Sequence, residues 1–84
     1  MADTLQLEIA TPEKEVAHVA VDSAQIPAKD GYLGILPGHA PLLSELGEGE
    51  LSYVSAGTTS QVNISGGYVE VRDNHIRVLA DKTT

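Results

Sequence analysis

The sequence predicts an all-β fold, namely a β-sandwich of short, mostly antiparallel strands joined by hairpins. Short apolar segments alternate with polar residues at a period of two, as in Leu5–Ile9, and this alternation is typical of half-buried strands. Turn-forming pairs such as Asp30-Gly31 and Asp73-Asn74 separate these segments. Nowhere does the apolar pattern take the periodicity of an amphipathic helix. Together these observations favour hairpin-connected strands over a helical architecture.

The N-terminal part of the chain contains the first expected strands. One strand covers Leu5–Ile9, and Thr11-Pro12-Glu13 ends it, because proline suits the first corner of a turn. Strand character resumes over Val16–Val21. The apolar phase then slips by one position, which predicts a β-bulge near Asp22-Ser23.

The segment Asp30–Leu43, with the sequence D-G-Y-L-G-I-L-P-G-H-A-P-L-L, is the most constrained part of the chain. Asp30-Gly31 forms a hairpin-type turn, so a strand that ends near Ala28 is expected to pair with Tyr32–Leu36. Pro37-Gly38 forms a second turn, and an apolar segment follows it. Because prolines fix φ, the loop is stiff, and stiff apolar loops on small domains are typical contact surfaces.

The second half of the chain continues the pattern of short strands. Leu51–Ser55 and Ser60–Ser65 are expected strands, and Gly66-Gly67 marks a bend or a close approach of two backbones. Tyr68–Arg72 and Ile76–Leu79 form a final hairpin. The apolar side chains that face inward on all these strands should form a buried core: Leu7, Ile9, Val21, Ile26, Ile35, Val62, Ile64, Val69, Val71, Ile76 and Val78.

Composition excludes several classes of function. The chain has 84 residues and a formal charge of −7, which argues against binding to nucleic acid or to anionic lipid. It has no cysteine, and no apolar run approaches the ~18 residues that a membrane-spanning helix needs. His39 has no second histidine or paired carboxylate close in sequence, so an interface or loop-bracing role is favoured over metal binding or catalysis. We therefore expect no catalytic residue, metal site or cofactor, and no insertion into a membrane.

Three motifs in register carry a resemblance to a known family. The segment Asp30–Leu43, the early turn T-P-E-K-E (Thr11–Glu15) and the closing S-G-G-Y-V-E-V (Ser65–Val71) with V-L-A-D (Val78–Asp81) resemble the epsilon subunit of F-type ATP synthases, called delta in mitochondria. The resemblance implies a non-catalytic rotor subunit in the central stalk of a proton-translocating enzyme. It further implies that the subunit links the gamma subunit to the c-ring, as a peripheral part of the complex at the cytoplasmic face of the bacterial inner membrane.

The resemblance also assigns two groups of contact residues. Tyr32 departs from the family, which commonly has glutamate there, and is either an aromatic cover at the strand edge or a contact residue. Asp30 supplies a negative charge two residues earlier. The residues expected to face the c-ring are Asp30, Gly31, Tyr32 and Leu33, and those expected to face gamma are Gly38, His39, Ala40, Pro41 and Leu42.

The expected organisation is one β-sandwich domain over residues 1–84. The helical hairpin that follows this sandwich in the family has no counterpart in these residues, so inhibition by that hairpin and its ATP site are not expected here. Two alternatives belong to other classes of protein. The chain could be a free-standing protein-binding module, or a lipoyl or biotinyl carrier that is modified on Lys29 at a hairpin tip.

Overall fold

A computed structural model describes residues 3–84, so Met1 and Ala2 of the expected domain lie outside the described residues. Residues 3–84 contain no helix, and the all-β prediction is confirmed. No helix long and apolar enough to cross a membrane occurs in this range. The strands are β1 (Leu5–Ala10), β2 (Glu15–Val21), β3 (Ser23–Ala28), β4 (Gly31–Ile35), β5 (Leu42–Glu45), β6 (Glu48–Ser55), β7 (Thr58–Arg72) and β8 (His75–Thr83).

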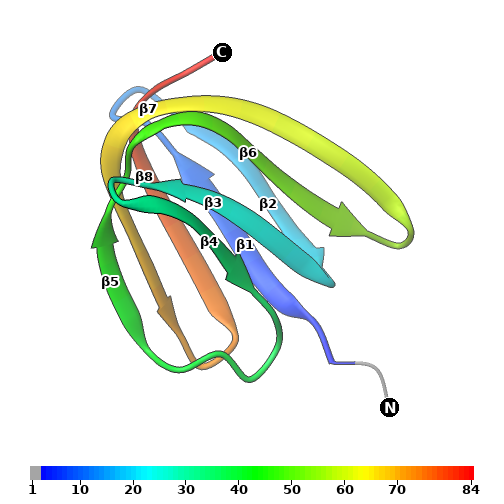
Figure 1. The fold of residues 1–84 in the computed structure, drawn as a ribbon. Coiled ribbons are helices and arrows are strands. Elements are labelled where there is room, and N and C mark those ends of the chain that lie inside the picture. The colour runs from blue at the N-terminus through cyan, green and yellow to red at the C-terminus, as the bar shows by residue number, and fades with distance from the viewer. Residues whose placement is uncertain (1–2) are drawn as a thin grey trace.

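The strands form two packed layers that share one strand. The first part of β7 pairs with β6 as far as Ser65. Its last part pairs with β8 from Ile64 to Arg72 and with β5 from Tyr68 to Val71. One layer therefore has the order β2-β1-β8-β7-β5, and the other has the order β7-β6-β3-β4. Figure 1 shows β7 arching over the top of the molecule from one layer into the other. Within the described residues β1 and β8 run parallel, and the other strand pairs are antiparallel.

The bend that carries β7 between the layers lies at Gly66-Gly67, where the sequence predicts a bend or a close backbone approach. Both glycines have positive φ angles, 69° and 110°, which residues with a Cβ rarely adopt. A Cβ on Gly67 would overlap the carbonyl oxygen of Leu79 on β8. Both parts of the prediction are confirmed, and what the sequence suggests as two strands is one continuous bent strand.

The core fills the space between the layers. Ten of the eleven predicted core residues are buried, and Val62 is only partly buried against them. Val62 lies where β7 pairs with β6 alone, at the edge of its layer, so fewer neighbours cover it. Six further residues are buried beyond those predicted: Leu5, Ala24, Pro27, Leu46, Leu51 and Ala80.

The slip in apolar phase after Val21 has a different cause from the predicted bulge. At Asp22 the chain leaves its partner β1 and enters the other layer, where the backbone N–H of Asp22 donates to the carbonyl of Val54 at 2.7 Å. Because the core lies between the layers, a strand that passes from one layer to the other turns its opposite face toward the core. The only register shift between β1 and β2 lies elsewhere, between Ile9 and Ala10. The prediction of a bulge at Asp22-Ser23 is therefore wrong.

Candidate functional site

The residues expected to face the c-ring lie on the β3–β4 hairpin. Ala28 pairs with Gly31, so Lys29 and Asp30 form the two-residue turn, one residue earlier than the sequence suggests. Asp30, Gly31 and Tyr32 are exposed, and Leu33 is half-buried. The turn itself is held by the backbone N–H of Lys29, which donates to the carbonyl of Glu45 at the end of β5 at 3.0 Å. The hairpin tip is therefore an exposed surface that is fixed to the neighbouring strand.

Tyr32 covers part of its own sheet and is also exposed. Its hydroxyl oxygen accepts a hydrogen bond from the backbone N–H of Glu50 on β6 at 3.1 Å, so the side chain reaches across β3. The hydroxyl lies 2.7 Å from the position that a Cβ of Gly49 would take, so a side chain at Gly49 would displace it. Tyr32 nevertheless remains 57% exposed. The ring is thus braced against its own sheet and keeps an exposed outer surface.

The residues expected to face gamma lie in the β4–β5 loop. Leu36 to His39 form a turn closed by the backbone N–H of His39, which donates to the carbonyl of Leu36 at 3.1 Å. Pro37 at the second position and a φ of 86° at Gly38 are those of a type II turn. The conformation of the loop is therefore held by Pro37 and by a backbone hydrogen bond within the turn.

His39 braces this loop rather than projecting from it. Its Nδ1 lies 2.7 Å from the carbonyl oxygen of Ala40, and because a carbonyl can only accept, the contact requires the tautomer protonated at Nδ1. His39 and Leu42 are half-buried, whereas Gly38, Ala40 and Pro41 are exposed. The sequence did not single out Leu36 as a contact residue, although its side chain is 62% exposed at the same turn.

The two groups of residues lie at opposite ends of β4. Gly31 begins the strand and Ile35 ends it, a separation of roughly 13 Å at the usual rise per residue. In Figure 1 the β3–β4 turn lies on the side where β7 bends, and the β4–β5 loop lies at the lower end, beside the β7–β8 turn. A hydrogen bond confirms the second arrangement, since the N–H of Gly38 donates to Oδ1 of Asn74 in the β7–β8 turn at 2.7 Å. The sequence around Asn74 predicts only that this residue lies in a turn.

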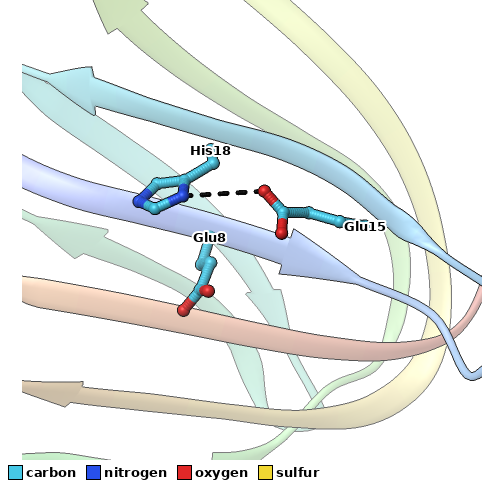
Figure 2. Close-up of side chains that lie close together, drawn as sticks. All are labelled: Glu8, Glu15 and His18. Carbon is cyan, nitrogen blue, oxygen red and sulfur yellow. Dashed lines mark ion pairs between the residues drawn. The ribbon is translucent and has the colours of Figure 1, made fainter.

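One group of metal-ligating side chains occurs on the outer face of the layer that contains β1 and β2. Figure 2 shows Glu8, Glu15 and His18, whose ligand atoms lie within 4.8 Å of one another. His18 and Glu15 are each at least half exposed and form a contact of 3.6 Å between Nδ1 and Oε1. The group is therefore largely solvated.

The environment of Glu8 opposes a cation at this place. Its Oε1 lies 3.2 Å from Nε2 of His75 and 3.3 Å from Nε of Arg77. The hydrogen bond from His75 and the nearby Arg77 guanidinium lower the pKa of Glu8 below its usual value. A divalent ion would compete with both donors and approach a fixed positive charge. The arrangement fits a surface ion-pair network.

Comparison with known proteins identifies the family. The family model described as "ATP synthase, Delta/Epsilon chain, beta-sandwich domain" matches residues 4–84. The ATP synthase epsilon chain of Solibacter usitatus is 53% identical over 96% of this chain and 60% of its own length. That of Koribacter versatilis is 48% identical over 96% of this chain and 57% of its own length. The chain thus spans about 60% of the length of these relatives.

Solved structures show the same fold. A chain in the cryo-EM structure of the OSCP/F1/c-ring part of Euglena gracilis mitochondrial ATP synthase superposes with a TM-score of 0.89 at 23% identity, over 96% of this chain and 52% of that one. A chain from the central stalk and c-ring of the Tetrahymena thermophila mitochondrial enzyme gives a TM-score of 0.79 at 19% identity, over 98% of this chain and 66% of that one. With the motifs, the two-layer fold and these matches in agreement, the chain belongs to the family of β-sandwich domains of ATP synthase delta and epsilon chains.

Proposed function

We propose that this chain is a non-catalytic rotor subunit in the central stalk of a proton-translocating F-type ATP synthase, where it links the gamma subunit to the c-ring. Its family and its bacterial relatives support the assignment to the epsilon chain. The fold it shares with chains of two mitochondrial ATP synthase assemblies is consistent with a place in the stalk. In a bacterium this place is peripheral, at the cytoplasmic face of the inner membrane.

The observation that carries the proposal is the pair of ordered, exposed surfaces at the two ends of β4. The β3–β4 hairpin, with Asp30, Gly31, Tyr32 and Leu33, would face the c-ring. The β4–β5 loop, with Gly38, His39, Ala40, Pro41 and Leu42, would face gamma. Both surfaces are fixed by hydrogen bonds within the chain, so little conformational entropy is lost when a partner binds. A linking subunit needs this combination of two separate surfaces on one stiff body.

The test measures the binding of the protein to purified gamma subunit and to purified c-ring. We expect His39→Ala with Tyr32→Ala to weaken assembly by ~1–3 kcal/mol. Because the Tyr32 hydroxyl bonds to the backbone of β6, Tyr32→Phe is the matched control: it removes that bond and keeps the ring. The His39→Ala single variant should weaken only gamma binding. If the double variant stays folded and assembles as tightly as the unmodified protein, the two residues do not belong to the interface.

The carrier alternative makes a different prediction about Lys29. Its side chain is 68% exposed at the β3–β4 turn, as the alternative requires, and its Nζ lies 3.4 Å from Oε2 of Glu45. Exposed pairs of this kind contribute little to stability, so the contact alone does not prevent modification. Intact-mass analysis after co-expression with lipoyl and biotinyl ligases decides the matter. An adduct on Lys29 would contradict the rotor assignment, and an unmodified mass would remove the alternative.

A further inference from the structure

Asn74 joins three segments that lie far apart in the sequence. With Asp73 it forms the two-residue turn between β7 and β8, and both residues have positive φ angles, 51° and 58°, as in a type I′ turn. Its backbone carbonyl accepts a hydrogen bond from the N–H of Gln6 at 2.9 Å. Its side-chain Oδ1 accepts from the N–H of Gly38 at 2.7 Å, across 36 positions of sequence. No other side-chain hydrogen bond within residues 3–84 reaches the β4–β5 loop from a different segment.

The bond to Gly38 selects one of two conformations of the loop. A Pro-Gly pair at the centre of a β-turn suits both type I and type II, and these differ by a flip of the peptide plane between the two central residues. The flip reverses the direction in which the N–H of Gly38 points. In the observed type II turn this N–H points at Oδ1 of Asn74. In a type I turn it would point away, and the hydrogen bond would be lost.

We propose that Asn74 is a positioning residue for the β4–β5 loop: its side-chain carbonyl holds Leu36–His39 in the type II turn, which is the conformation that docks on the partner. The identity of that partner as the gamma subunit rests on the function proposed above. Gly38, Ala40 and Pro41 are exposed, so the turn type determines which backbone groups and which face of Pro37 and Leu36 a partner meets. Asn74 itself is half-buried behind the loop and acts through Gly38.

The experiment compares two glycine substitutions in the same turn. Asn74→Gly removes Oδ1 and keeps a residue suited to positive φ. Asp73→Gly is the matched control, because Asp73 also has positive φ, is exposed, and makes no side-chain hydrogen bond within residues 3–84. Both variants relieve the same kind of backbone strain, so an effect on folding should be common to them. Asn74→Asp, which keeps Oδ1, should restore the bond to Gly38.

Two readouts are measured on each variant: hydrogen exchange of the Gly38 amide by NMR, and affinity for purified gamma subunit. Asn74→Gly should speed Gly38 exchange by about tenfold, the factor that corresponds to one net hydrogen bond, and should weaken gamma binding by up to a similar factor. Asp73→Gly should leave both unchanged, and Asn74→Asp should return exchange toward the unmodified rate.

Each outcome decides a different step. If Gly38 exchange is the same in Asn74→Gly and in the unmodified protein, Asn74 does not hold the turn and the proposal is overturned. If exchange speeds up but gamma binding stays unchanged while His39→Ala weakens it, the turn type is irrelevant to docking and the positioning role is overturned. If Gly38 exchange speeds up in Asn74→Gly, but neither Asn74→Gly nor His39→Ala weakens gamma binding, Asn74 holds the turn and the docking surface of the proposed function is wrong.

Discussion

Gly67→Ala should be among the most destabilising single-methyl additions in this protein. Gly67 lies in the bend of β7 with a φ of 110°, opposite Ala80 of β8. An added Cβ would overlap the carbonyl oxygen of Leu79 and lie 3.0 Å from both the carbonyl carbon of Leu79 and the Cα of Ala80. These are backbone atoms, which, unlike a side chain, cannot rotate away from the added Cβ. The two strands must separate instead, at the position where both layers meet.

The expected cost follows from two contributions. Holding a residue with a Cβ in a region of φ that is nearly exclusive to glycine costs about 1–3 kcal/mol. Separating β7 from β8 weakens at least one backbone hydrogen bond, at about 1 kcal/mol each, and loosens core packing around it. These two contributions add to about 2–4 kcal/mol before the loss of packing is counted, a large part of the ~5–10 kcal/mol expected for a domain of this size.

Gly57→Ala is the matched control for this substitution. Gly57 also has a positive φ, 81°, but a Cβ there would meet no atom within 4 Å. Gly57→Ala should therefore lower the free energy of unfolding only by the backbone strain, about 1–2 kcal/mol. The free energies of unfolding are measured by urea denaturation followed by circular dichroism, since the chain has no tryptophan. A difference between the two variants of less than about 1 kcal/mol would refute the argument that the close approach at Gly67 is structural.

Three further predictions follow from the core, the ion-pair network and the absence of phosphate-binding motifs. Val69 is fully buried, so Val69→Asp should abolish cooperative unfolding in a thermal melt, because an unpaired buried charge costs several kcal/mol; a melt within a few degrees of the unmodified protein would contradict the core placement. The pKa of Glu8 is lowered by His75 and Arg77, so the stability that Glu8 contributes is present above its unfolded-state pKa and is lost as pH falls through the lowered value. Glu8→Gln should therefore flatten the acid limb of the stability–pH curve, and an unchanged limb would show that the network is not coupled to folding. Isothermal titration of ATP into the 84-residue chain should give no binding at low micromolar levels, and binding there would reveal a nucleotide site that the sequence motifs do not describe.

The features predicted correctly from the sequence are the local ones. The alternation in Leu5–Ile9 determines which side chains of β1 are buried, because side chains on a strand alternate between its two faces. The glycine pair at Gly66-Gly67 marks the bend through the φ angles that only glycine adopts readily. In each case the physical constraint acts within a few residues, so it is visible in the sequence itself.

The features that were missed depend on partners distant in the sequence. The parallel pairing of β1 with β8 joins the two ends of the fold, and nothing in either strand specifies that partner. The phase slip at Asp22 has the same local pattern whether the strand bulges or changes layers. Asn74 suits a tight turn for local reasons, and its bond to Gly38 becomes visible only when the β4–β5 loop is folded against it. Such contacts can be identified only from the three-dimensional structure.

The strand shared by the two layers has a mechanical consequence. In a sandwich whose layers touch only through side chains, a sideways load is resisted by non-directional apolar contacts, and the layers can slide. Here a load applied to one layer passes into the other along the covalent backbone of β7. The backbone hydrogen bonds that flank the bend, such as that from the N–H of Leu46 to the carbonyl of Gly67 at 2.9 Å, are then strained together rather than one after another. Sliding of one layer over the other is therefore opposed by the backbone of β7 as well as by the apolar contacts of the core.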